Sequence, residues 1–171
     1  DFLKCRRIQL RLYIDAFNPY SMFENLKAGI LRITTENAIP KEGKLQGICD
    51  LLQAEIPYYD WVGFYFRNGD REELKLGPFA GDPTDHTIIP FGKGICGQVA
   101  LSNQNFVVPN VASQDNYIAC SIHVKAEIVV PVFVDGVNIG QIDIDSHTAD
   151  PFTDQDEEFL EFVCLEVAKI L

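Results

Sequence analysis

Residues 127–145 read EIVVPVFVDGVNIGQIDID, and this stretch gives the strongest indication of the architecture. Two runs rich in β-branched residues, 127–134 and 137–145, flank Asp135-Gly136, a dipeptide typical of two-residue hairpin turns. We therefore predict two strands joined as a hairpin, and these two strands would pair in an antiparallel sheet.

A second hairpin is predicted upstream of the first. The aromatic run 61–66 and the run 74–79 flank residues 68–70, whose sequence Asn-Gly-Asp is that of a turn. Between the two hairpins, residues 80–124 contain repeated Gly and Pro, so only one short helix, 95–101, is expected there. Functional residues often lie on such loop-rich segments.

Three longer helices are predicted outside the hairpins. Ser21 and Glu24 have the spacing of a capping box, which predicts a helix from Ser21 to about residue 37. Residues 45–56 place apolar side chains on one helical face, and Thr153, followed by acidic residues, predicts the start of the last helix. This order of helices and strands predicts an α+β domain, with an antiparallel sheet and helices packed against it.

Composition restricts the domain organisation and the partners. With 171 residues and 47% hydrophobic content, the chain can bury one substantial core, and we expect an N-terminal extension at 1–20 and a single domain at 21–171. The net charge of −11 repels phosphate backbones and anionic lipid, so neither nucleic acid nor a membrane is an expected partner. No apolar run approaches the roughly 20 residues of a membrane-spanning helix.

Five cysteines, at positions 5, 49, 96, 120 and 164, are irregularly spaced. Because the chain has no Cys-x-x-Cys pair and no histidine at metal-ligand spacing, no metal site is expected. The irregular spacing favours reduced thiols and a cytoplasmic location over a secreted disulfide framework. Cys5, Cys49 and Cys164 are interpreted as core residues, whereas Cys96 and Cys120 lie in loop-like contexts.

Three carboxylates interrupt otherwise apolar strands. Asp143 and Asp145 alternate with isoleucines and therefore share one face of their strand, and Glu127 opens the neighbouring strand. These acids either coat a solvated face or line a cavity. Val137 and Ile139 have the parity of the two aspartates, which favours a cavity beside an apolar surface. Acids in a cavity repel one another unless a cation neutralises them, and a substrate ammonium group or a metal ion would do so.

Trp61 and Tyr65 share one face of the first predicted strand, at positions i and i+4. Core packing is the simpler interpretation, and the functional one is a wall over a methyl or thioether group. Cys96 lies near the start of the predicted short helix, where backbone NH groups favour a thiolate. Thiols beside acids indicate redox chemistry on a small polar substrate.

Six motifs, taken in order, resemble those of the free methionine-(R)-sulfoxide reductases, which are GAF-fold enzymes. The resemblance covers residues from about 45 to 168, and it implies a GAF-like α+β fold with a central antiparallel sheet of about six strands and helices packed on it. The motifs are Trp61-Val62-Gly63-Phe64-Tyr65, Leu76-Gly77-Pro78-Phe79, Gly92-Lys93-Gly94-Ile95-Cys96-Gly97, Ile118-Ala119-Cys120, Glu127-Ile128-Val129-Val130-Pro131 and Ile142-Asp143-Ile144-Asp145-Ser146.

This resemblance implies reduction of free methionine-(R)-sulfoxide to methionine through a cysteine sulfenic acid and a disulfide. It implies that Cys120 is the nucleophile and Cys96 the resolving thiol. The three acids described above would hold the substrate's ammonium group and help protonate its oxygen, and Trp61 and Tyr65 would wall the pocket. No bound cofactor is implied; thioredoxin is the implied external reductant, and a homodimer the implied assembly.

One departure from the family's pattern concerns recycling. Where the family usually carries a third cysteine, ten residues before the Gly-x-Cys-Gly cysteine, this chain has His86. Either Cys96 alone resolves Cys120, or the chain has kept the pocket and lost efficient turnover. The second case corresponds to a GAF-type sensor module, which binds a small molecule or responds to oxidants. His86 is interpreted as a surface loop residue, with assistance to a thiolate as the alternative.

Overall fold

A six-stranded sheet forms the centre of the protein, seen here in a computed structural model that describes residues 19–114 and 123–171. The strand order is β3-β2-β1-β6-β5-β4, and every neighbouring pair is antiparallel. The predicted α+β class with a central antiparallel sheet is confirmed. The strands are β1 (Trp61–Arg67), β2 (Glu73–Ala80), β3 (Ile88–Pro90), β4 (Phe106–Val108), β5 (Ala126–Val134) and β6 (Val137–Ser146).

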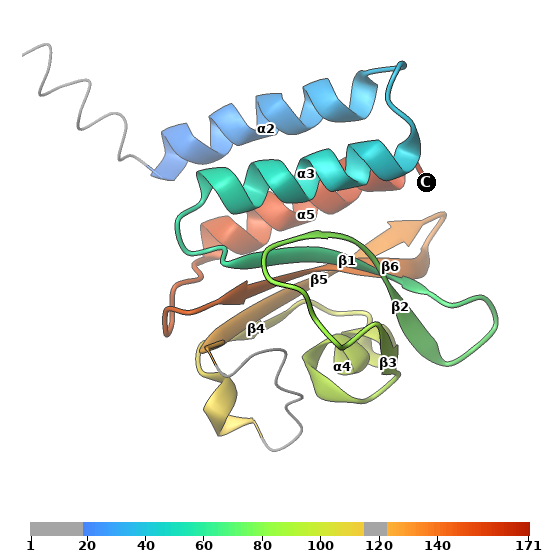
Figure 1. Ribbon diagram of the computed structural model, residues 1–171, viewed down its shortest axis with the longest axis vertical. Helices are drawn as coiled ribbons and strands as arrows, with labels where there is room; N and C mark the ends of the chain where they lie inside the picture. The colour runs from blue at the N-terminus through green and yellow to red at the C-terminus, as the bar shows by residue number, and fades with distance from the viewer. Residues whose placement is uncertain (1–18, 115–122) are drawn as a thin grey trace, which may run out of the picture.

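Helices lie on both faces of this sheet (Figure 1). One face carries α2 (Pro19–Thr35), α3 (Lys41–Glu55) and α5 (Asp154–Ala168), which form a layer of three roughly parallel rods. The short helix α4 (Gly94–Ser102) lies on the opposite face, together with a 3₁₀ turn at Val111–Ser113. The sheet therefore separates a helical layer from a loop-rich layer.

Each face of the sheet buries its own apolar cluster because alternate strand residues point in opposite directions. Ile128, Ile142 and Ile144 point toward the helical layer and join its core. On the other face, Tyr65 and Val99 belong to a second cluster between the sheet and α4. The loop-rich face thus has a packed interior of its own, in which a site can be held rigidly.

Most predicted elements are present close to their expected positions. Asp135 and Gly136 have φ values of 51° and 78°, the two positive values that a tight hairpin turn between β5 and β6 requires. Thr153 is the N-cap of α5, and its backbone NH donates to the Asp156 carboxylate at 2.8 Å. The predicted apolar stripe of α3 is buried, from Leu45 to the capping residue Ile56.

Two details differ from the sequence-based expectation. The described part of α2 runs from Pro19, so Ser21 lies inside this helix and is not its N-cap. The strands β3 and β4 were not predicted, because three residues each are too few to show alternation.

A break in register near the end of the β5–β6 hairpin changes one prediction about the acidic face. Val132 pairs with Gly140, whereas Phe133 pairs with Asn138, so Ile139 is the extra residue of a bulge. Ile139 packs against the helical core, and Val137 is 59% exposed. The expectation that these two residues extend the acidic face as an apolar surface was wrong.

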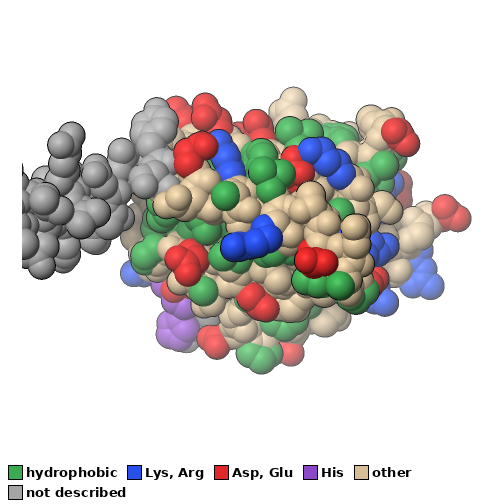
Figure 2. All heavy atoms as spheres, turned by 90° about the horizontal axis from the view of Figure 1, so that it is seen from above, with side chains coloured by type: hydrophobic (Ala, Val, Ile, Leu, Met, Phe, Trp, Pro, Cys, Tyr) green, Lys and Arg blue, Asp and Glu red, His purple; other side chains and the backbone are tan. Residues whose placement is uncertain are grey.

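Charges of both signs are mixed on the helical side of the protein. Figure 2 shows this face with acidic, basic and apolar side chains interspersed, without a gathering of lysine and arginine on the part of the face that is described. Within residues 19–114 and 123–171, no helix is long and apolar enough to cross a bilayer.

Candidate active site on the loop-rich face of the sheet

The three acids come together because the strand register aligns them. Asp145 of β6 pairs with Glu127 of β5 on one side and with Trp61 of β1 on the other. Asp143 pairs with Gly63 in the neighbouring row. All three acids lie on the face opposite the helical layer, which confirms the predicted alternation with the isoleucines. The three acids are 1–3% exposed, so they line an interior and do not coat a solvated surface.

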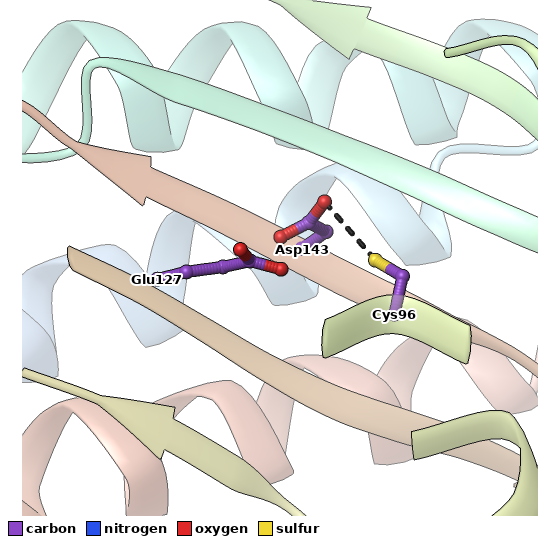
Figure 3. Close-up of side chains that lie close together, drawn as sticks. All are labelled: Cys96, Glu127 and Asp143. Atoms are coloured by element: carbon purple, nitrogen blue, oxygen red, sulfur yellow. Dashed lines mark hydrogen bonds between the residues drawn. The ribbon is translucent and has the colours of Figure 1, made fainter. Parts of the chain in front are cut away.

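Cys96 reaches this acidic face because α4 packs very closely against its own preceding loop. A Cβ at Gly97 would lie 2.5 Å from the Pro90 carbonyl oxygen, so only glycine permits this approach. Cys96 then faces β6, and its thiol donates a hydrogen bond to Oδ2 of Asp143 with Sγ and oxygen 3.2 Å apart (Figure 3). The predicted proximity of a thiol to the acids is therefore present for Cys96.

Burial shifts the proton affinity of all three acids upward. It raises the pKa of Asp143 to about 7, and the hydrogen bond from Cys96 opposes that shift. The pKa of Glu127 is well above its ordinary range because of burial and, secondarily, the charges of Asp143 and Asp145. Burial, then the charges of Asp143 and Asp60, likewise raises the pKa of Asp145. The cluster therefore retains protons near neutral pH, and a cation that enters it would displace them.

Several polar atoms on this face have no hydrogen-bond partner in the described part of the chain. They are Oδ1 of Asp143, Oδ1 of Asp145 and both side-chain polar atoms of Gln141. An unsatisfied buried polar atom costs about 1–3 kcal/mol, so proteins rarely keep one without a functional reason. Gln141 has the same strand parity as the two aspartates, and we add it to the candidate site. Sequence reasoning missed it because an amide in a strand carries no distinctive signal.

Trp61 and Tyr65 form a wall beside the acids. The indole ring covers Gly63, where a Cβ would lie only 2.2 Å from Trp61, and it stacks on Phe79 at a centroid distance of 5.6 Å. Tyr65 is fully buried, and its hydroxyl donates to the backbone oxygen of His86 at 2.9 Å. Both aromatic residues therefore pack in the core and also hold the 82–86 loop beside the site.

Two hollows flank the row of acids. One is lined by Cys96, Glu127 and Asp143 together with His86 and Lys93. The other is lined by Trp61, Asp145, Asp60 and His147, among others. Acids of the cluster thus line both hollows and give each a polar wall.

Comparison with known proteins agrees with this geometry. Residues 44–171 match the family model of the GAF domain. The free methionine-R-sulfoxide reductase of Escherichia coli is 37% identical over 121 residues, which are 71% of this chain and 72% of that protein. The protein of the same name from Saccharomyces cerevisiae is 36% identical over 132 residues, 70% of this chain and 73% of its own length. This chain belongs to the free methionine-(R)-sulfoxide reductase family.

A solved structure of this reductase family also has a similar fold. The free methionine-R-sulfoxide reductase from Neisseria meningitidis, in complex with its substrate, is 31% identical and has a TM-score of 0.78. The match covers 91% of this chain and 89% of that one. The likeness therefore extends over nearly the whole chain.

The structure brings some of the predicted reductase residues together, and another lies outside the part of the chain that it describes. Cys96, Glu127 and Asp143 lie together, whereas Cys120 lies outside the described residues. His86, expected on the surface, is partly buried and lines the same hollow as Cys96. Its loop is held there by the hydrogen bond from Tyr65, a long-range contact that the sequence does not signal.

Two other cysteines of this reductase are core residues, as expected. Cys49 and Cys164 are buried, and burial raises the pKa of both thiols. Each donates a weak hydrogen bond to a backbone oxygen, of Pro78 at 3.4 Å and of Val130 at 3.6 Å. Neither is poised as a nucleophile, since a reactive cysteine needs a stabilised thiolate. Cys5 lies outside the described residues.

Proposed function

We propose that this protein reduces free methionine-(R)-sulfoxide to methionine. One observation carries the proposal: Glu127, Asp143 and Asp145 are buried together beside the Cys96 thiol. No lysine or arginine of the described ranges forms an ion pair with them. Such a cluster attracts a cation, and the free amino acid supplies one in its ammonium group. The names of the Escherichia coli and Saccharomyces cerevisiae relatives support the same substrate.

The ammonium group restricts the substrate to the free amino acid. In a peptide, the methionine nitrogen is an amide and carries no charge, so it gains nothing from the buried acids and leaves them unpaired. Unpaired buried polar groups give strong discrimination, because their desolvation is no longer compensated. Trp61 and Tyr65 then provide an apolar wall for the methyl and thioether part.

In the first half-reaction, the thiolate of Cys120 attacks the sulfoxide sulfur. The sulfur becomes electrophilic when its oxygen accepts a proton, and Asp143, whose pKa is about 7, is the proposed proton donor. The oxygen is transferred to Cys120 as a sulfenic acid, and methionine leaves as the reduced product. One thiol and one sulfoxide thus become one sulfenic acid and one thioether.

In the second half-reaction, Cys96 resolves the oxidised cysteine. Its thiol attacks the sulfenic sulfur of Cys120, a disulfide forms and water leaves. A dithiol reductant of the thioredoxin type then restores both thiols, in a cytoplasmic setting and in a homodimeric enzyme. His86 stands where the family usually has a third cysteine, so Cys96 carries the resolving step alone.

A coupled assay tests this proposal directly. NADPH oxidation is followed with thioredoxin, thioredoxin reductase and free methionine-(R)-sulfoxide, and the parent is compared with Cys120→Ser and Cys96→Ser. We expect no turnover with Cys120→Ser, whereas Cys96→Ser retains a single turnover and fails to cycle. The matched control is Cys164→Ala, which removes a core thiol and keeps both proposed reactive cysteines.

The alternative is a GAF-type sensor module without efficient turnover. Binding of free methionine-(R)-sulfoxide without any consumption of NADPH would favour that reading. Equal rates for the parent and Cys120→Ser would remove Cys120 from the chemistry. Turnover of N-acetylmethionine sulfoxide at the rate of the free amino acid would contradict recognition of the ammonium group.

A further inference from the structure

One thiol and two carboxylates converge on a single point from three different elements (Figure 3). Cys96 lies on α4, Glu127 on β5 and Asp143 on β6. One potential ligand atom from each lies within 4.8 Å of the other two. All three residues are buried, so solvent does not screen the electrostatic repulsion between their charged forms.

The cluster also contains an unsatisfied electron-pair donor. Oδ1 of Asp143 has no hydrogen-bond partner among the described residues, although the side chain is only 1% exposed. Figure 3 shows that the Asp143 oxygen not bonded to Cys96 points toward the Glu127 carboxylate. Two carboxylate groups thus face each other across a small gap, with the Cys96 sulfur beside them, and a cation between them would satisfy all three.

We propose that Cys96, Glu127 and Asp143 bind one thiophilic divalent cation of the zinc class when no substrate fills the pocket. Zinc bonds of about 2.0–2.3 Å to oxygen and sulfur set tetrahedral ligand atoms roughly 3.4–3.6 Å apart. Sγ of Cys96 and Oδ2 of Asp143 are already 3.2 Å apart, so small side-chain rotations complete the geometry. The Cys96 thiol loses its proton to solvent as the metal–sulfur bond forms.

The fourth position of this site opens toward a hollow, where a water molecule fits as an exchangeable ligand. That hollow is also lined by His86 and Lys93. The positive charge of Lys93 opposes a cation, but two carboxylates and a thiolate carry three negative charges and outweigh it. The site is therefore accessible to metal from one side.

The ligand set selects among metals. A thiolate with two carboxylates suits zinc or cobalt, which accept sulfur and low coordination numbers. Magnesium prefers six oxygen ligands at nearly octahedral positions, and it is not expected to bind here. The sequence argument against a metal considered ligand spacing along the chain, whereas this cluster depends on the packing of α4 against the sheet.

Metal binding has a consequence for catalysis, which rests on the proposed function. The same acids would hold the substrate ammonium group, and the metal would occupy Cys96. Zinc should therefore compete with free methionine-(R)-sulfoxide and raise its apparent KM. If the protein binds the metal but its metal-free form does not turn over free methionine-(R)-sulfoxide, the metal site stands and the proposed function is contradicted.

The test uses the intact chain, stripped with a chelator and kept reduced by a phosphine. Cobalt(II) is titrated while the thiolate-to-cobalt charge-transfer absorption is followed, and zinc affinity is measured by competition with a chromophoric chelator. We expect one metal per chain and a charge-transfer band. We expect at least tenfold weaker binding in Cys96→Ser and in Asp143→Asn, and no effect of excess magnesium.

Two control variants keep the expected result interpretable. Cys164→Ala removes a buried core thiol and should retain one metal per chain, and Asp50→Asn removes an exposed acid and should change nothing. Circular dichroism establishes that each variant is folded. The proposal is overturned if the parent binds no metal in a one-to-one ratio, if Cys96→Ser keeps the charge-transfer band, or if magnesium displaces cobalt.

Discussion

At the scale of single residues, Asp143 is a carboxyl group that opposes folding at neutral pH. Its pKa is about 7 in the folded chain and lower when unfolded, so the folded state binds more protons between about pH 4 and 7. Stability therefore falls as the pH rises through that window. We expect Asp143→Asn to stabilise the fold by roughly 2–4 kcal/mol at pH 7.5, and the gain to vanish near pH 4.

Thermal unfolding of the parent and of Asp143→Asn at both pH values measures this effect. Asp50→Asn is the matched control, because Asp50 is exposed and should show no such dependence on pH. A variant that is less stable than the parent at pH 7.5 would mean that the ionised Asp143 has a stabilising partner.

Gly63 provides the space that the only tryptophan occupies. A Cβ at Gly63 would lie 2.2 Å from Trp61, so Gly63→Ala must move the indole ring and is expected to cost roughly 1–3 kcal/mol. The change should be visible as a shift in tryptophan fluorescence, which reports Trp61 alone. Gly47→Ala is the control: its nearest neighbour is at 3.8 Å, inside α3, so it should be neutral or slightly stabilising. Equal stabilities of the two variants would contradict this account.

The site residues could be predicted from the sequence only where the alternation of side chains along a strand determines which face they share. The shared face of Asp143 and Asp145 follows from the two-residue period of β6. The bond from Cys96 to Asp143 joins residues 47 apart in the sequence, and it depends on the close approach of α4 at Gly97. Local patterns contain no information about that packing, so periodicity could not predict the contact between the thiol and the acid.

At the scale of elements, Asp156 joins the start of α5 to the segment that leads into β1. Its carboxylate accepts hydrogen bonds from the hydroxyls of Tyr58 at 2.8 Å and Tyr59 at 3.1 Å, and from Thr153 at the helix N-cap. Asp156→Ala leaves these donors unsatisfied and should destabilise the fold by roughly 2–4 kcal/mol. Asp154, exposed in the same first turn, is the matched control.

Chemical denaturation of Asp156→Ala and Asp154→Ala gives the comparison. We expect a loss of less than about 1 kcal/mol for Asp154→Ala, which removes only a favourable charge near the helix start. A similar loss in both variants would show that the helix dipole, and not the tyrosine contacts, accounts for the effect.

Helices and strands with a strong local sequence signal were predicted well, whereas those with a weak sequence signal were missed. The β5–β6 hairpin has turn residues that few other structures accept, and α3 has a clear apolar stripe. The three-residue strands β3 and β4 exist because they extend an edge already formed by β2 and β5, which is a tertiary effect. The bulge at Ile139 has the same origin, since it depends on the partner strand.

At the scale of the whole molecule, the acidic cluster lies in a protein whose net charge is already −11, so protons compete with any cation for the site. The raised pKa values of Glu127 and Asp145 mean that binding of a substrate ammonium group to these two acids must release protons, whereas Asp143 keeps the proton that it donates to the sulfoxide. The Kd for free methionine-(R)-sulfoxide should therefore fall as the pH rises from 6 to 8, by up to about tenfold per pH unit for each proton released. Calorimetry in buffers of different ionisation enthalpy counts those protons, and Glu127→Gln should release fewer. A Kd that is constant over this range would mean either that the acids are already ionised in the free protein or that the ammonium group binds elsewhere.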